Sequence, residues 1–294
     1  MVDIKKISHV CYDTPDLAQQ TEYYTNVLGL TLIDKGSSEI YLSSTTEHHS
    51  VVLRQGPTNC TTLGFQIGKD DDLDAFEHQV KAHGIKTERK RDAQPTIADQ
   101  LTFEDIKGTV IEVFRAPEPL QHGFQVKGVV PNKLGHVAFH VTDVQAATKF
   151  YVDVLGFRTS DWIGDFFSFL RCSSDHHTIN LIGTGTNRHF HTAFELRDWG
   201  HVQSACDLLG REGYQLLWGP GRHGPGHNLF TYHKGPNGLI TELFAELDVM
   251  PDEALGYFEP RTWHRDHPQR PKIWPKGPDT ANFWGPGPSD EMNK

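Results

Sequence analysis

Two histidines and a glutamate in the second half of this chain have the residue types and the setting of a metal site. His136, His191 and Glu242 each lie in a short apolar or alternating run that is typical of a strand. Intervals of 55 and 51 residues separate them, so only the tertiary fold can bring them together. Two imidazoles and one carboxylate on neighbouring strands form a facial triad, which binds a divalent iron from one side and leaves three coordination positions free.

For each residue by itself, a structural role is the alternative. A lone histidine in a strand is more often a hydrogen-bonded core residue than a ligand, and Glu242 in ITELF could face solvent. The metal interpretation therefore depends on how the three positions relate to the rest of the chain.

An internal repeat relates the three positions to the first half of the chain. HVCYDTPDLAQQTEYYTNVLGL from His9 aligns without a gap with HVAFHVTDVQAATKFYVDVLGF from His136, at an offset of 127 residues. The ends of the copies match as well, because GTVIEVF at 108–114 resembles GLITELF at 238–244. Each half therefore runs from a histidine-containing strand to a glutamate-containing strand.

The first half keeps two of the three candidate ligands. His9 and Glu112 occupy the outer positions, but Thr62 in TTLGFQI stands where the second half has His191. Because the middle ligand is missing there, we expect the metal site in the second half only.

Local patterns predict the elements that must position these residues. Each copy begins with a strand followed by a helix, and Gly29 and Gly156 can supply the left-handed residue at the helix end. Amphipathic helices that end in glycine are predicted over 73–84 and 200–213, and the remaining alternating runs predict strands. Each half is then two βαβββ modules, so we expect an α+β fold with a repeated mixed sheet.

Length and composition indicate the domain organisation and exclude several classes of protein. With 294 residues, 37% of them hydrophobic, the chain is long enough for two globular domains, which we place at 1–120 and 130–250, followed by an arm at 255–294. The net charge of −10 argues against a nucleic-acid partner, and no apolar run is long enough to predict a membrane span. The start MVDIKKISHV lacks a signal-peptide pattern and the four cysteines form no CxxC pair, so we expect a cytoplasmic protein.

Longer motifs carry a family resemblance. LGHVAFHV, HHTINL, RHFHTAFEL and GRHGPGHNLFTYHKGPNGLITELF, with the YYTNVLG and FYVDVLG helices, resemble the type I extradiol ring-cleaving dioxygenases of the vicinal oxygen chelate superfamily. The similarity covers residues 5 to about 250 and is closest to the homoprotocatechuate 2,3-dioxygenase and catechol 2,3-dioxygenase group. It implies two tandem glyoxalase-type domains, of which the second holds Fe(II), or less often Mn(II), and it makes His136, His191 and Glu242 the ligands.

The same resemblance implies roles for polar residues around the metal. A family histidine near the oxygen site corresponds to His176 or His177 in HHTINL, where it would supply a proton as the O–O bond breaks. Because side chains alternate along a strand, only one of the two can face inward, and we favour His176. His223 and Tyr232 match the pair that hydrogen-bonds the substrate.

Two other histidines are left outside the ligand set. His140 follows His136 by four residues on the same sheet face, about 13 Å away along the strand. His189 precedes His191 by two residues on the same face. We expect both to lie, at most, around the ligands.

The C-terminal segment at 255–294 differs in composition from the two domains. It holds seven of the 17 prolines and three of the six tryptophans, Trp263, Trp274 and Trp284. Such a stretch is predicted to form neither a helix nor a central strand, so we expect an extended arm that packs over the active-site mouth or on another subunit. It resembles the C-terminal lid of homoprotocatechuate 2,3-dioxygenases, and an arm of this kind leads us to expect a homo-oligomer.

Two sets of residues point to different substrates. In the resembled group arginines bind the substrate carboxylate, and Arg261, Arg265 or Arg270 of the arm could do so here. Trp218, however, stands where that group has an arginine, which supports a more apolar or larger catechol at least as well. We assign substrate binding to His223, Trp218 and Arg261.

These motifs imply an extradiol dioxygenase that cleaves a catechol-type ring next to its two hydroxyls with O2, in aromatic compound degradation. A glyoxalase-type isomerase or transferase would take ligands from both halves or across a subunit boundary, which Thr62 argues against. A non-catalytic ligand-binding module of the same fold is usually a single domain, and it would leave the three ligands and Tyr232 unexplained.

Overall fold

The computed structural model describes residues 2–36, 38–120 and 123–293. The chain divides into two compact units. The first contains residues 1–134, 149–157 and 235–239, and the second contains 135–148, 158–234 and 240–294. All three candidate ligands fall in the second unit.

The first half of the chain forms an eight-stranded sheet with the order β2-β3-β4-β1-β5-β8-β7-β6. Its elements are β1 (Lys6–Thr14), α1 (Leu17–Glu22), the π-helical turn η1 (Tyr23–Val27), β2 (Thr31–Lys35), β3 (Glu39–Ser43), β4 (Val51–Gln55), β5 (Asn59–Ile67), α2 (Leu73–Ala82), β6 (Glu88–Gln94), β7 (Ile97–Glu104) and β8 (Val110–Arg115). Each βαβββ module closes by parallel pairing of its first and last strands, β1 with β4 and β5 with β8.

The second half repeats this pattern in a nine-stranded sheet with the order β14-β15-β16-β13-β9-β12-β11-β10-β17. Its elements are β9 (Lys133–Val141), α3 (Val144–Asp153), β10 (Arg158–Ile163), β11 (Phe167–Arg171), β12 (Ile179–Gly183), β13 (Arg188–Glu195), α4 (Trp199–Arg211), β14 (Leu216–Arg222), β15 (Leu229–Lys234) and β16 (Ile240–Ala245). Here β9 pairs in parallel with β12, and β13 with β16. The predicted α+β fold of two βαβββ modules per half is confirmed.

The helices predicted over 73–84 and 200–213 form as α2 and α4, with ends that differ by at most two residues. At the start of α1, α2 and α4, the side chains of Asp16, Asp72 and Asp198 each accept a hydrogen bond from a backbone N–H of the first turn. Gly29 and Gly156 have φ angles of 80° and 74°, which confirms the left-handed positions expected there.

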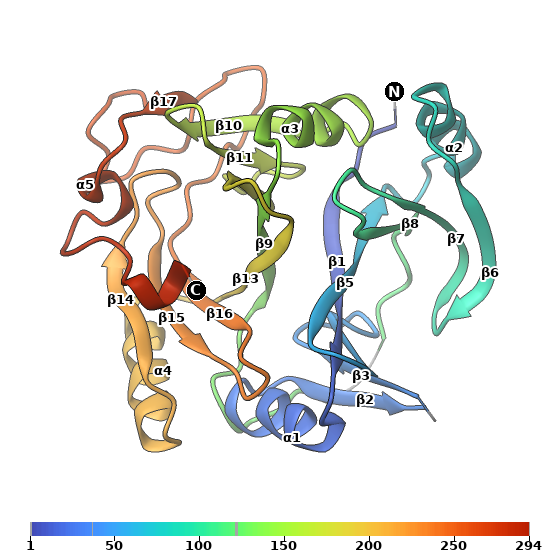
Figure 1. The fold of residues 1–294 in the computed structure, drawn as a ribbon, viewed down its shortest axis with the longest axis horizontal. Helices are drawn as coiled ribbons and strands as arrows, with labels where there is room; N and C mark the ends of the chain where they lie inside the picture. The colour runs from blue at the N-terminus through green and yellow to red at the C-terminus, as the bar shows by residue number, and fades with distance from the viewer. Residues whose placement is uncertain (1, 37, 121–122, 294) are drawn as a thin grey trace. The chain divides into compact units, whose positions relative to one another are not determined.

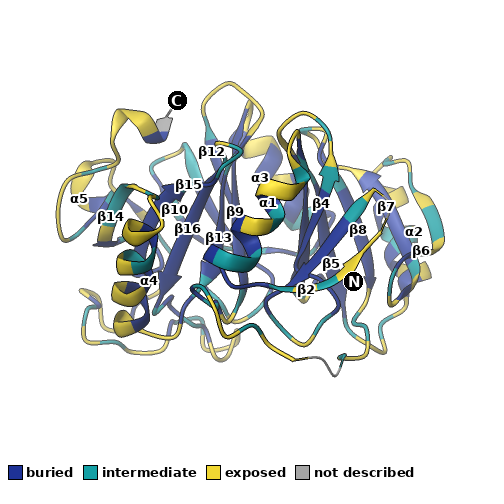
Figure 2. Cartoon of the chain, turned by 90° about the horizontal axis from the view of Figure 1, so that it is seen from below, coloured by how far each residue is buried: buried dark blue, intermediate teal, exposed yellow. Residues whose placement is uncertain are grey.

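Most strands are buried, whereas β2 and β6 are largely exposed. Figure 2 shows β9, β13 and β16 as buried, whereas α4 exposes its outer face. On its inner face α4 buries Val202, Ala205 and Leu209. Within 2–36, 38–120 and 123–293, no helix combines the length and the apolar character that a bilayer crossing requires.

The C-terminal arm packs within the second unit and contains β17 (Lys272–Trp274), the helical turn α5 (Pro278–Ala281) and η2 (Asp290–Asn293). β17 pairs in parallel with β10 at one end of the sheet. At the other end the Phe283 N–H donates to the Arg222 carbonyl of β14, at 2.7 Å. The arm therefore bridges the two ends of the curved sheet (Figure 1).

Two details of the arm refine the expectation of an extended chain. The helical turn α5 was not expected, but it has Pro278 in its first turn, where a missing N–H removes no helical hydrogen bond. β17 is an edge strand, which a proline-rich segment can form. Of the tryptophans, Trp274 is buried against Ile163 and Phe169, whereas Trp284 is 53% exposed.

Candidate metal centre and adjoining cavity

Three adjacent strands bring the candidate ligands together. His136 lies on β9, His191 on β13 and Glu242 on β16, and all three side chains are buried. The Nε2 atoms of His136 and His191 each lie 3.0 Å from Oε2 of Glu242, and 3.3 Å from each other. Residues more than fifty positions apart in the chain thus present three ligand atoms to one point.

The chemistry of this donor set fits a divalent metal ion. Burial by itself would raise the pKa of Glu242, but the two imidazoles outweigh it and hold that pKa well below its ordinary value. Burial lowers the pKa of His191, so its imidazole is neutral, as a ligand must be. The second glutamate oxygen, Oε1, accepts a hydrogen bond from the Asn228 side chain at 3.0 Å, which fixes the carboxylate.

The corresponding position in the first half has a different arrangement. His9 Nε2 lies 3.0 Å from Oε2 of Glu112, as in the second half. The second contact to that oxygen, which His191 makes in the second half, is made here by the side-chain amide of Gln94, at 2.5 Å. Thr62 is buried in place of the middle ligand. The Glu112 oxygen that corresponds to Oε2 of Glu242 therefore accepts a hydrogen bond from an amide N–H.

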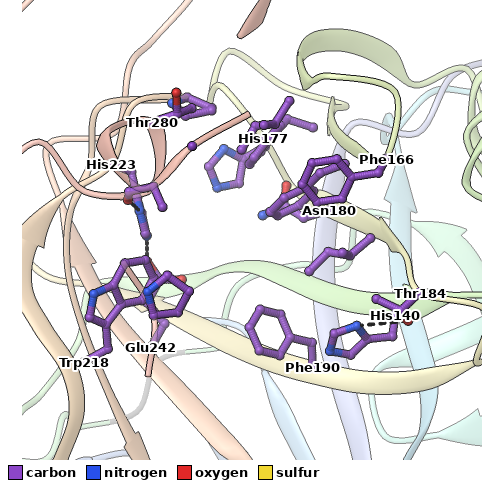
Figure 3. A pocket seen from close by; sticks show the side chains of 18 residues that line it. His140, Phe166, His177, Asn180, Thr184, Phe190, Trp218, His223, Glu242 and Thr280 are labelled. Carbon is purple, nitrogen blue, oxygen red and sulfur yellow. Dashed lines mark hydrogen bonds and ion pairs between the residues drawn. The ribbon is translucent and has the colours of Figure 1, made fainter. Parts of the chain in front are cut away.

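A cavity of about 300 Å³ adjoins the metal centre. Glu242, His177, His223 and Trp218 line one part of it, as Figure 3 shows. The remaining wall is mainly apolar and includes Ile163, Phe166, Phe167, Phe169, Ile182 and Phe190. The cavity therefore combines a polar, metal-facing part with an aromatic and aliphatic part, as small-molecule sites commonly do.

His177, and not His176, faces this cavity. The His177 ring lies 4.3 Å from the ring of His136, and the residue lines the cavity. His176 is buried behind it, with Nε2 2.9 Å from the Asp161 carboxylate. The preference for His176 as the inward residue is therefore corrected: its ring is held by Asp161, which itself accepts a hydrogen bond from Trp274 Nε1 of the arm.

The same contacts determine which nitrogen of His177 is available. A carboxylate only accepts, so Nε2 of His176 donates to Asp161, and Nδ1 of the same ring is directed at His177. Nδ1 of His177 lies 2.9 Å from Nδ1 of His176, so the two rings share one hydrogen bond. Burial lowers the pKa of His177 well below its ordinary value, so the ring is neutral. Nδ1 of His177 is therefore engaged by His176, and Nε2 is the nitrogen left for a molecule in the cavity.

His223 and Tyr232 form a hydrogen-bonded pair beside Glu242. His223 Nδ1 donates to the Ala281 carbonyl of the arm at 2.6 Å, so Nε2 accepts from the Tyr232 hydroxyl at 2.9 Å. Trp218 stacks on Tyr232, with ring centroids 5.4 Å apart, and donates from Nε1 to the Pro286 carbonyl. Contacts from the arm thus orient both His223 and Trp218.

None of the three candidate arginines of the arm lines the cavity. Arg261 pairs with Glu259 at 2.9 Å, which corrects its assignment to substrate binding. Arg265 lies over the ring of Phe283, and Arg270 donates to backbone carbonyls. Within the described part of the chain, neither an arginine nor a lysine lines the cavity.

Three positioning contacts were missed by the sequence interpretation. They are Asn228 on Glu242, Asp161 on His176, and the Ala281 carbonyl on His223. Asn228 directly follows HGPGH in the motif GRHGPGHNLFTYHKGPNGLITELF, so the sequence did contain a signal for this residue. Asp161 and Ala281 come from unrelated parts of the chain and carry no local signal.

The arm is also attached by a second group of metal-capable side chains, His227, Asp248 and His264. His227 Nδ1 and His264 Nε2 lie 2.7 Å from different oxygens of Asp248. Arg261 N–H lies 3.4 Å from His264 Nδ1, which leaves the ring proton on Nε2. Two imidazole donors on different oxygens of one carboxylate form a hydrogen-bonded latch between the arm and the segments that follow β14 and β16, which we call the arm latch.

We predict that Asp248→Asn lowers the free energy of unfolding by about 2–4 kcal/mol at pH 7, because it weakens two buried charge-assisted hydrogen bonds. Burial by itself would raise the pKa of Asp248, but His227 and His264, with His176 also nearby, hold this pKa at about 2. An aspartate in the unfolded chain has a pKa of about 3.9. The contribution of Asp248 to the free energy of unfolding is therefore complete well above pH 4, falls to about half at pH 3 and is lost through pH 2.

Equilibrium unfolding in urea at pH 7 and at pH 3 checks this prediction. The difference in the free energy of unfolding between the native protein and Asp248→Asn should be smaller at pH 3 than at pH 7. An equal difference at the two pH values would contradict the arm latch.

The model of the glyoxalase/bleomycin resistance protein/dioxygenase superfamily matches residues 6–113 and 133–243. Metapyrocatechase 2 of Cupriavidus necator is 36% identical over 129 residues, which are 43% of this chain and 40% of that protein. The iron-dependent extradiol dioxygenase of Rhodococcus jostii (strain RHA1) is 26% identical over 86% of this chain and 93% of its own length. Among solved structures, the Mn(II)-bound glyoxalase from Novosphingobium aromaticivorans has a TM-score of 0.86 at 28% identity, and the match covers 98% of this chain and 94% of that one.

Proposed function

Since the chain belongs to the glyoxalase/bleomycin resistance protein/dioxygenase superfamily, we propose that it is an extradiol dioxygenase, which cleaves a catechol ring next to its two hydroxyls with O2. The observation that carries the proposal is the convergence of His136, His191 and Glu242 beside a cavity that His177 and His223 also line. The similarity to an iron-dependent extradiol dioxygenase over most of the chain supports it.

His136, His191 and Glu242 would hold the metal. Fe(II) is the proposed ion, and Mn(II) is the alternative, since one relative is iron-dependent and a similar structure binds Mn(II). When bound, such an ion would hold the two catechol oxygens and O2 side by side and let electrons pass between them. Asn228 keeps the glutamate in the orientation that this requires.

The chain's own residues move the protons. Nε2 of His177 can accept a proton and return it to oxygen as the ring opens. A catechol hydroxyl beside His223 can donate to Nε2 in place of Tyr232, and the Tyr232 hydroxyl then becomes a donor to the substrate oxygen. The aromatic wall excludes water from these steps.

The lining of the cavity supports an apolar substrate. It is rich in phenylalanine and isoleucine, and a buried carboxylate would find no cationic partner among the residues that line it. We therefore propose that alkyl- or aryl-substituted catechols are better substrates than homoprotocatechuate, which carries a carboxylate.

The proposal is tested by O2 uptake. Protein loaded anaerobically with Fe(II) is mixed with catechol, 3- and 4-alkylcatechols, 2,3-dihydroxybiphenyl or homoprotocatechuate before O2 is admitted. We expect one O2 consumed per catechol with a new yellow absorbance, and homoprotocatechuate as the poorest substrate. A protein that binds one metal ion per chain but consumes no O2 with any ring would reject the function.

A glyoxalase-type isomerase is the second candidate, because the Mn(II)-bound glyoxalase has a similar fold. It would isomerise the hemithioacetal of an α-ketoaldehyde and a thiol without consuming O2. The Gln94–Glu112 contact in the first half argues against a second set of ligands there. Product analysis with this substrate, under the same metal loading, separates the two functions.

We predict that Tyr232→Phe lowers kcat/KM for the best catechol by about ten- to a hundredfold, because the substrate oxygen loses a buried donor. The fold should be retained, since the ring still stacks under Trp218. Steady-state O2 uptake measures the effect. A value of kcat/KM within twofold of the native protein would show that this hydroxyl does not bind substrate.

We also propose that the protein works as a cytoplasmic homo-oligomer. The arm leaves Trp284 half exposed beside Trp199, with ring centroids 5.6 Å apart, and an exposed aromatic pair of this kind supports a subunit contact. Light scattering on the purified protein would give the mass. A monomeric mass at micromolar concentration would contradict the proposal.

A further inference from the structure

Two buried polar atoms on the wall of the cavity have no hydrogen-bond partner among the described residues. They are Oδ1 of Asn180 and Nε2 of His140. The side chains are only 2% and 4% exposed. Buried polar atoms in native proteins are nearly always paired, so two unpaired atoms on residues of one cavity wall point to a partner that the described residues do not supply.

Both residues lie along the cavity wall that leads away from the metal centre. In the parallel pairing of β9 with β12, Asn180 is opposite Ala138 and Ile182 is opposite His140. These positions are two and four residues beyond His136, or about 7 and 13 Å along the strand. Figure 3 shows His140 across the cavity from Trp218 and His223.

The chemistry of this wall favours an uncharged, hydrogen-bonding group. Burial lowers the pKa of His140 to about 4, so its ring is neutral and Nε2 can pair with a hydroxyl or an amide. Nδ1 of the same ring lies 3.3 Å from the hydroxyl of Thr184, which is exposed and holds the ring at the solvent end of the cavity. Phe166 and Phe190 line the cavity around these atoms.

We propose that His140 and Asn180 determine substrate specificity by binding an uncharged polar substituent on the side group of the catechol. This inference rests on the proposed function and adds the substrate class. The substrate is an elongated catechol whose ring lies at the metal centre and whose apolar side group passes between the phenylalanines. Its far part carries a hydroxyl or amide that reaches Asn180 or His140.

The test compares four ligands at equilibrium. Metal-loaded protein is titrated calorimetrically, without O2, with 2,3-dihydroxybiphenyl and with its derivatives that carry one further hydroxyl at the 2′, 3′ or 4′ position. The three isomers together cover the directions in which the side group can present a donor. We expect at least one isomer to bind about tenfold or more tightly than the parent, because a buried polar group rejects a ligand that leaves it unpaired.

Two variants test whether His140 and Asn180 cause the tighter binding of the hydroxylated isomer. His140→Phe and Asn180→Leu keep the side-chain size and remove the polar atoms, so the preference for the hydroxylated isomer should fall below about threefold in at least one of them. His78→Phe is the matched control: it makes the same exchange on the exposed side of α2 and should keep the native preference.

The outcomes separate this inference from the proposed function. If no isomer binds more tightly than the parent, or if the preference survives in both variants, the specificity site is rejected. Binding is measured without O2, so a preference that is not followed by O2 uptake would reject the dioxygenase and keep the site. Cleavage of all four ligands at equal affinity would reject the site alone.

Discussion

Replacing His191 with alanine is expected to abolish O2-dependent cleavage of catechols, with kcat falling by at least about a thousandfold. The substitution removes one of the three candidate ligand atoms, which lie about 3 Å apart, and a site with one imidazole and one carboxylate would hold a divalent ion much more weakly. Metal content after dialysis, measured by atomic emission, should fall together with O2 uptake.

The chain provides its own control for this substitution. Thr62 is the repeat-equivalent of His191, and it is buried in the half where Gln94 contacts the glutamate. Thr62→Val should therefore leave metal content and O2 uptake unchanged. If His191→Ala kept its metal and its activity, the assignment of the metal centre would be wrong.

The second large loss of kcat is expected when His177 is replaced. His177→Phe keeps an aromatic ring against His136 but removes the nitrogen that faces the cavity, so kcat should fall by about a hundred- to ten-thousandfold, as for the loss of a positioned acid–base group. Metal content should be unchanged, because His177 is not among the three ligands. Single-turnover O2 uptake with saturating catechol measures the effect directly.

His176 gives the matched comparison, since it is the adjacent histidine in the same motif. His176→Gln removes its buried contact with Asp161, so we expect a loss of about 3–5 kcal/mol in the free energy of unfolding and a change in kcat of less than about tenfold. His177→Phe should thus mainly lower kcat, whereas His176→Gln should mainly lower the free energy of unfolding. A larger loss of kcat in His176→Gln than in His177→Phe would contradict the placement of His177 at the oxygen site.

The comparison of these two histidines shows where sequence interpretation reaches its limit. Alternation along a strand predicts that neighbours face opposite sides, but it does not say which one faces inward. His176 and His177 also precede β12, which begins at Ile179, so the strand pattern does not extend to them. A contact with Asp161, fifteen residues earlier, decides the orientation.

The arginines of the arm illustrate the same limit. Arg261 has the charge that a substrate carboxylate needs, but Glu259, two residues earlier, pairs with it. A segment with little regular structure has no period from which the direction of a side chain could be inferred. The arm latch of His227, Asp248 and His264 likewise joins residues whose sequence spacing carries no signal.

By itself the sequence determined the repeat and the four βαβββ modules, and it singled out the three candidate ligands with their incomplete counterpart at Thr62. Hydrophobic periodicity and helix caps are local patterns, and the internal offset relates the sequence to itself. All three can therefore be recognised in the sequence alone. Only the tertiary structure decided that His177 faces the cavity, that no arginine of the described residues lines it, and that Asn180 and His140 of its wall each have an unpaired polar atom. These properties depend on contacts between segments far apart in the chain, where packing and competition for hydrogen-bond partners, and not residue type, determine the outcome.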